Sequence, residues 1–204
     1  MHKCVAILVG ARLVVDKIAL RHRLPSSRAL AAHLNRGGLI AYPTEACFGL
    51  GCDPRNRFAV QQLLKLKHRP QRKGLILVAA KFSQVERYLK PLTDAEQQRL
   101  QQDGAQVITN LMPAKSSCPR WLRGEHDTLA VRLTTHPVAA RLCRELGRAL
   151  VSTSANVSGK HPAKTAAACQ KMFGEKVWVL PGKVGNRKRP SLIRAWTDGK
   201  ILRQ

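Results

Sequence analysis

KLKHRPQRKGLILV, residues 65–78, places five formal cations and His68 within nine residues and then continues directly into an apolar, β-prone segment. Pro70 and Gly74 interrupt regular backbone structure inside the charged part, which predicts a basic loop leading into a buried strand. Like charges this dense repel one another. The stretch is therefore either a solvated basic turn or a pocket in which an anionic ligand such as phosphate offsets the repulsion.

Length and composition favour one basic globular domain. The chain has 204 residues, enough for a sizeable core, and 36 Lys plus Arg against 12 Asp plus Glu give a net charge of +24. Such a charge favours polyanionic partners, so nucleic acid or a nucleotide is the expected ligand class, although a generally basic proteome would give the same balance. Apolar runs are too short to cross a membrane, and no membrane partner is expected.

The six cysteines predict neither a zinc site nor a disulfide framework. None forms a C-x-x-C pair, and their spacing matches no structural zinc pattern. A domain of this size does not need covalent stapling, so reduced thiols and a cytoplasmic location are expected, with no protein-held metal.

The N-terminal segment, residues 1–23, is interpreted as a basic extension of uncertain order that precedes a domain spanning residues 24–204. It is basic and apolar, but Arg12 and Asp16 interrupt the apolar part and no small-residue cleavage site follows. A secretory signal is therefore disfavoured, and a transit peptide is a weaker alternative.

Helical and extended patterns alternate along the rest of the chain, which predicts an α/β fold with a twisted, mixed sheet and loops gathered at one edge. Capping and periodicity predict helices from Ser26-Ser27 to residue 34, over 57–66, from Ser83, from Thr93, after His136-Pro137 and over 165–173. Apolar runs predict strands at 39–42, 75–79, 107–111, 128–133, 149–152 and 177–180, and a hairpin turn at 197–200 before a last short strand.

Polar loops follow several of these strands, where open α/β sheets place ligands. We expect loops at 43–53, 113–123, 153–159 and 182–190. On strand 128–133, Arg132 shares a face with Ala130, opposite Leu129 and Val131. A strand arginine in such surroundings needs an anion, either a structural carboxylate or a ligand, and the scarcity of acids favours a ligand.

Taken together, these loops resemble the YrdC/Sua5 family, and in particular its short single-domain branch. The matching residues are Tyr42-Pro43-Thr44-Glu45, Lys67-His68-Arg69, Lys73-Gly74-Leu75-Ile76-Leu77, Pro119-Arg120-Trp121-Leu122, Leu129-Ala130-Val131-Arg132, His136-Pro137, Ser154-Ala155-Asn156 and Pro190-Ser191 with Ile193. The resemblance covers about residue 25 to the end of the chain. It implies a YrdC-like single domain with a large basic cleft.

The resemblance also implies an activity: a nucleotidyltransferase that makes threonylcarbamoyl-adenylate and pyrophosphate from L-threonine, bicarbonate and ATP. That adenylate would serve the modification of adenosine 37 in tRNA through a downstream transferase complex. Such chemistry depends on positioning and charge neutralisation, and Mg²⁺ is expected to accompany ATP. By this resemblance the catalytic residues are Lys67 and Arg69, and the substrate-binding residues are Thr44, Lys73, Thr109, Arg132, His136, Ser154, Asn156 and Ser191.

One segment departs from the family pattern. Where the family has Pro-Gly-Pro-x-Thr, this chain reads Ala105-Gln106-Val107-Ile108-Thr109, and Gly104 replaces a common Trp. An altered cleft wall is therefore expected.

Two competing interpretations remain: a module that binds tRNA or double-stranded RNA without making an adenylate, and a divergent relative that uses another carbamoyl substrate. RNA binding would fall steeply with salt and would not need threonine.

Overall fold

The computed structural model describes residues 24–203, so the interpretation of residues 1–23 lies outside the described part. The α-helices in the described part are α2 (Ser27–Asn35), α3 (Arg57–Leu66), α4 (Asp94–Ala105), α5 (Arg120–Arg123), α6 (Pro137–Leu146) and α7 (Ala166–Phe173). The strands are β1 (Ile40–Pro43), β2 (Phe48–Gly51), β3 (Ile76–Ala79), β4 (Ile108–Pro113), β5 (Thr128–Leu133), β6 (Leu150–Ser154), β7 (Trp178–Val179), β8 (Leu192–Ala195) and β9 (Ile201–Arg203). No helix among residues 24–203 is long and apolar enough to cross a membrane.

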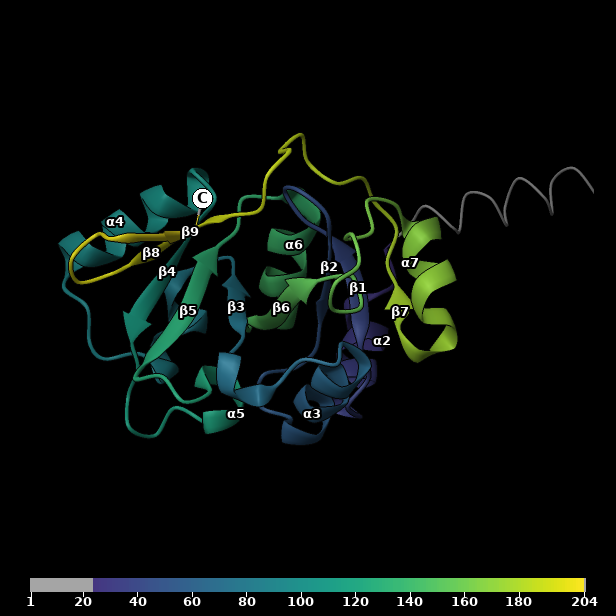
Figure 1. Cartoon of the computed structure of the whole chain (residues 1–204), viewed down its shortest axis with the longest axis horizontal. Helices are drawn as coiled ribbons and strands as arrows, with labels where there is room; N and C mark the ends of the chain where they lie inside the picture. Colours follow the sequence, from purple (N-terminus) through teal and green to yellow (C-terminus); the bar gives the residue numbers. More distant parts are fainter. Residues whose placement is uncertain (1–23, 204) are drawn as a thin grey trace, which may run out of the picture.

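The strands form one mixed sheet in the order β7-β1-β2-β6-β3-β5-β4-β8-β9, which confirms the predicted α/β class (Figure 1). The β1–β7, β3–β5 and β4–β8 pairs are parallel, and the remaining neighbours are antiparallel. The segment between β7 and β8 crosses the molecule from the α7 end to the α4 end (Figure 1). Residues far apart in the sequence therefore meet near the middle of the sheet.

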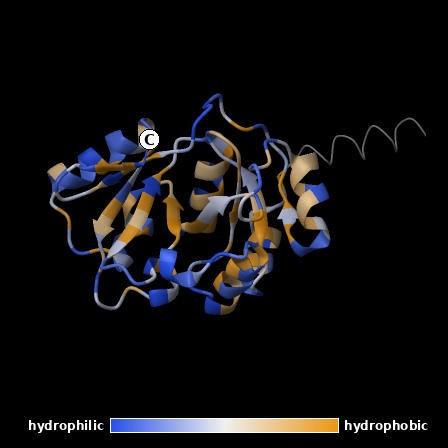
Figure 2. Ribbon diagram, viewed as in Figure 1, coloured by the Kyte–Doolittle hydropathy of each residue, from blue (hydrophilic) through white to orange (hydrophobic). Residues whose placement is uncertain are grey.

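Two apolar cores lie on opposite faces of β1. Ile40 and Tyr42 belong to the smaller core, which α2 and α6 cover, whereas Ala41 belongs to the larger core that includes residues of α3, α4 and α7. This follows from the alternation of side chains along a strand. The strands are mostly apolar and the connecting loops mostly polar (Figure 2).

Most predicted helix ends are confirmed by their caps. The side chains of Ser26, Asn56 and Thr165 accept hydrogen bonds from backbone N–H groups in the first turns of α2, α3 and α7. Thr93 and Glu96 form the reciprocal capping box of α4. The C-cap of α6 is Gly147, in the left-handed conformation that glycine tolerates best.

Three local predictions are wrong. The expected loop at 43–53 contains β2, which pairs with both β1 and β6, and the expected loop at 113–123 ends in the short helix α5. The helix expected from Ser83 is two short 3-10 turns instead. There the Gln84 side chain is held by Ala80 N–H and the Cys143 carbonyl, and Leu89 already bridges to Ala114, so the chain has no room for a regular helix.

Gly124 ends α5 and packs against the basic turn at 71–73, and its substitution gives the first testable prediction. Its φ is +68°, and an added Cβ would collide with the Arg72 carbonyl oxygen and approach Gly74 N to 2.7 Å. We expect Gly124→Ala to lower the free energy of unfolding by about 2–4 kcal/mol, measured by urea denaturation. Gly159→Ala is the control, because Gly159 also has positive φ (+81°) but faces open space. It should cost only about 1–2 kcal/mol; equal losses would contradict the collision.

Candidate active site

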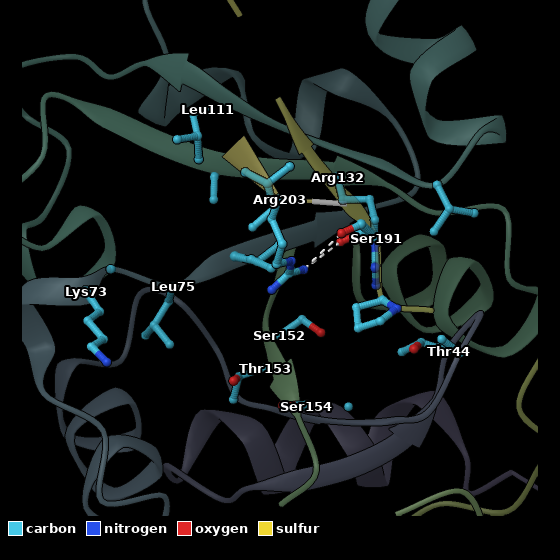
Figure 3. A pocket seen from close by; sticks show the side chains of 18 of the residues that line it. Thr44, Lys73, Leu75, Leu111, Arg132, Ser152, Thr153, Ser154, Ser191 and Arg203 are labelled. Atoms are coloured by element: carbon cyan, nitrogen blue, oxygen red, sulfur yellow. Dashed lines mark hydrogen bonds between the residues drawn. The ribbon is translucent and has the colours of Figure 1, made fainter. Parts of the chain in front are cut away.

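A cleft of about 460 Å³ opens between the basic turn, the loop after β1, the end of β6 and the strands β5, β8 and β9. Of the predicted site residues, Thr44, Arg69, Lys73, Arg132, Ser154 and Ser191 line it. Lys73 and Thr44 lie at opposite ends of the hollow, with Arg132, Ser152 and Arg203 between them (Figure 3). Lys73 therefore marks one end and the Thr44 hydroxyl the other, and two arginines lie between them.

The basic turn is a pocket wall and not merely a solvated turn. α3 ends at Leu66, and His68, with φ of +49°, reverses the chain so that Arg69 points back over the turn. The Arg69 guanidinium donates to the Gly74 carbonyl through Nη2 (2.8 Å) and Nε (3.3 Å). Burial, together with the Arg203 guanidinium, lowers the pKa of Arg69 below its ordinary value. The guanidinium is thus fixed at the cleft without a carboxylate partner among the described residues.

Lys67 lies behind the cleft wall and is only 3% exposed. Its Nζ donates to the carbonyls of Ser154 (2.6 Å) and Asn156 (2.7 Å) and to Asn156 Oδ1 (3.1 Å). Burial and the nearby Arg69 lower the pKa of Lys67 to about 8. The lysine therefore ties the end of α3 to the 154–156 loop, and in this arrangement its three protons are directed at protein oxygens.

Asn156 belongs to the same tie and does not line the cleft. Besides Lys67, its Oδ1 accepts from Ser154 Oγ (2.6 Å), and its Nδ2 donates to the Lys160 carbonyl (2.6 Å). These bonds make residues 154–160 one hydrogen-bonded unit, in which Ser154 lies at the cleft wall and Asn156 lies behind it. Lys67, Ser154 and Asn156 are thus brought together by bonds to one another, and of the three only Ser154 lines the cleft.

Arg132 pairs with a structural carboxylate and also lines the cleft. It lines the cleft, and its Nη2 lies 3.3 Å from Glu45 Oε2. The amino-acid sequence favoured a ligand over a structural carboxylate as the partner of Arg132. The structure shows a carboxylate partner, because Glu45 in the loop after β1 reaches the guanidinium. Burial alone would raise the pKa of Glu45, but Arg132 and the Thr134 hydroxyl outweigh it and hold that pKa below its ordinary value.

Thr109 and His136 lie outside the wall of the cleft. Thr109 is fully buried on β4 and donates to Ser191 Oγ (2.8 Å), so it holds a residue that lines the cleft. His136 is the N-cap residue of α6, and its Nε2 lies 3.1 Å from the Lys183 carbonyl, an arrangement that fastens the 182–190 loop. Burial lowers the pKa of His136 below its ordinary value, consistent with a neutral ring.

Arg203 is a site residue that the sequence did not suggest. It lies on β9, and its Nη2 donates to the Ser191 carbonyl (2.9 Å) beside Arg132 (Figure 3). Burial and Arg132 lower the pKa of Arg203. A single arginine at the second-to-last position of the sequence carries no pattern of its own. Only the antiparallel pairing of β9 with β8 brings it to the cleft.

The altered segment before β4 forms part of the wall, as expected. Val107 lines the cleft with a positive φ of 60°, an uncommon conformation for a β-branched residue. Gly104 packs against Leu133, where an added Cβ would come within 2.6 Å of the Leu133 carbonyl oxygen. A larger residue at 104 would therefore require a different path for this segment.

The side chains of the cleft do not form a metal site. No group of three or more His, Cys, Asp or Glu residues that could hold an ion occurs in the described part of the chain. Glu45 is the one acidic side chain among the residues that line the cleft in this part, and Arg132 already neutralises it.

Comparison with known proteins agrees with this geometry. The family model for Sua5, YciO and YrdC, described as telomere recombination, matches residues 32–204. The chain belongs to this family. It is 52% identical over 177 residues to the threonylcarbamoyl-AMP synthase of Methylobacillus flagellatus, covering 87% of this chain and 98% of the relative. It is 46% identical over 173 residues to that of Escherichia coli O1:K1 / APEC, covering 84% and 91%.

Solved structures of the family share the fold. The crystal structure of P. abyssi Sua5 complexed with L-threonine matches with a TM-score of 0.75 and 28% identity, covering 86% of this chain. The chain spans only 52% of that longer protein. E. coli YciO matches with a TM-score of 0.73 and 22% identity over 88% of this chain and 90% of its own, which supports the fold alone.

Proposed function

We propose that this protein is a threonylcarbamoyl-AMP synthase, which forms L-threonylcarbamoyladenylate and pyrophosphate from L-threonine, bicarbonate and ATP. The observation that carries the proposal is the convergence of Arg69, Lys73, Arg132 and Arg203 with the hydroxyls of Thr44, Ser154 and Ser191 in one cleft. The relatives named threonylcarbamoyl-AMP synthase, about half identical over most of the chain, support it independently.

In the proposed reaction, the amine of threonine and bicarbonate form a carbamate and water. The carbamate oxygen attacks the α-phosphorus of ATP, a new P–O bond forms, and the bond to the pyrophosphate leaving group breaks. Arg69 and Lys73 neutralise charge on the phosphates, and Mg²⁺ enters bound to ATP. The hydroxyls of Thr44, Ser154 and Ser191 hold the amino acid, Arg132 assists with the nucleotide, and Lys67 keeps the 154–156 loop in place.

The product belongs upstream of tRNA modification. A mixed anhydride of a carbamate and a phosphate is an activated acyl donor, and a downstream transferase complex would move its threonylcarbamoyl group to adenosine 37 of tRNA. Direct contact with tRNA or double-stranded RNA is a second candidate, favoured by the net charge of +24 and the exposed cations of the 182–190 loop. This interaction would be lost as salt rises and would not require threonine.

The deciding experiment incubates the protein with ATP, bicarbonate and labelled threonine and detects the mixed anhydride chromatographically. We expect labelled adenylate and stoichiometric pyrophosphate, both absent when threonine is omitted. Threonine-independent RNA binding without adenylate would support the binding module instead. Adenylate formed only when another carbamoyl substrate replaces threonine and bicarbonate would support the divergent carbamoyl enzyme.

A further inference from the structure

Four of the five buried side-chain atoms without a hydrogen-bond partner in the described residues belong to one group of side chains beside the cleft. They are Tyr42 Oη, Glu45 Oε2, Arg132 Nε and His136 Nδ1. Buried polar atoms are normally paired, so such a concentration calls for an explanation. Among these side chains, the charged pair of Glu45 and Arg132 is the one that reaches the cleft wall.

The Glu45 carboxylate is held firmly in place. It is 7% exposed, and its Oε1 accepts from Thr134 Oγ1 at 2.6 Å. Its backbone is also fixed, because Arg187 N–H donates to the Glu45 carbonyl (3.1 Å) and Gly185 N–H donates to the Thr44 carbonyl (2.9 Å). Oε2 is too buried to touch a ligand in the cleft, so Glu45 acts only through what it contacts.

The Arg132 guanidinium faces Glu45 on one side and the cleft on the other. The ion pair to Glu45 Oε2 at 3.3 Å is its one charged contact, and the guanidinium donates no hydrogen bond within residues 24–203. The N–H groups of its Nη atoms are therefore available to an anionic group of a substrate, whereas Nε is buried. A guanidinium that is anchored in advance loses less freedom when it binds, and its fixed fork favours one orientation of the ligand.

We propose that Glu45 is a positioning residue for the synthase reaction: it anchors Arg132 so that the free edge of the guanidinium meets a substrate anion at a fixed place. This inference rests on the proposed function. A positioning role differs from a purely structural one. In a structural role the buried pair of Glu45 and Arg132 would stabilise the fold, and removing it would leave the substrate affinity of the folded protein unchanged.

The test compares Glu45→Gln with Arg132→Gln, measuring kcat and KM for ATP and for threonine, calorimetric binding of each, and thermal unfolding. Gln keeps the size of Glu45 and its bond from Thr134 but removes the charge. We expect both variants to raise the KM and Kd of the same one substrate at least tenfold. kcat of Glu45→Gln should stay within about threefold, and the double variant should bind no more weakly than Arg132→Gln.

Asp53→Asn is the matched control. Asp53 is also buried (3% exposed) and pairs with Arg148 (3.0 Å) and Arg55 (2.9 Å), but it lies outside the cleft. It should lower the unfolding temperature without changing either KM. If Glu45→Gln behaves in the same way, the proposal is overturned and Glu45 is structural.

Two further results keep the inference separate from the proposed function. If Glu45→Gln does not fold, Glu45→Asp replaces it, because this variant keeps the charge but withdraws it by one methylene. It should still weaken binding of the same substrate about three- to tenfold. Unchanged binding by the Asp variant overturns the proposal. If the unaltered protein makes no adenylate, the proposed function fails, while calorimetry with ATP and threonine still decides whether Glu45 and Arg132 act on one ligand.

Discussion

Replacing Arg69 with alanine is expected to slow formation of threonylcarbamoyladenylate at least about a hundredfold while the domain remains folded. The guanidinium lines the cleft at the end that carries Lys73, where we place the phosphates, and it has no carboxylate partner among residues 24–203. Its loss removes a fixed charge that would neutralise the triphosphate. Pyrophosphate release with saturating ATP and threonine measures the rate, and circular dichroism checks the fold.

Arg72→Ala is the control for this prediction. Arg72 is an exposed cation in the same turn, and it does not line the cleft. Its removal changes the net charge equally and should leave the rate within about threefold. Arg69→Lys should fall between the two, because it restores the charge but not the two bonds to the Gly74 carbonyl. Near-normal activity in Arg69→Ala would refute the assignment.

The second large effect is expected at Lys67, where activity and stability should fall together. Lys67→Met keeps the aliphatic stem but removes the ammonium donor from the Ser154 carbonyl and from two oxygens of Asn156. The Ser154 carbonyl and Asn156 Oδ1 each keep one other donor, whereas the Asn156 carbonyl is left without one among the described residues. Unsatisfied buried acceptors cost about 1–3 kcal/mol each, partly relieved by entry of water, so we expect a loss of about 2–4 kcal/mol in unfolding free energy. Adenylate formation should drop at least about a hundredfold, because Ser154 loses its fixed position.

Urea denaturation and the adenylate assay together read out this prediction. Lys65→Met, an exposed lysine at the end of the same helix, should change neither quantity appreciably. A Lys67→Met protein that is inactive but as stable as the unaltered chain would show that the ammonium serves a phosphate and not the 154–156 loop.

Local patterns were enough to predict α3, α6 and β5 and the side on which Arg132 lies, because helix caps and strand alternation act over a few residues. They failed at β2, whose short Phe-Gly-Leu-Gly run becomes a strand only because β1 and β6 flank it. They also failed at Ser83, where contacts to Cys143 and Ala114 replaced the helix.

The amino-acid sequence by itself determined the α/β class, the family, and the residue types that a reaction on ATP and an amino acid requires. It could not separate the residues that line the cleft from those behind it. Lys67, Asn156 and Thr109 hold the wall from behind, while Arg203 enters it from the last strand. Only tertiary structure decided this, because the contacts of Lys67 and Thr109 join segments 80 or more residues apart, and Arg203 reaches Ser191 only through the pairing of β9 with β8. A short-range pattern carries no information about which side chain fills a shared space.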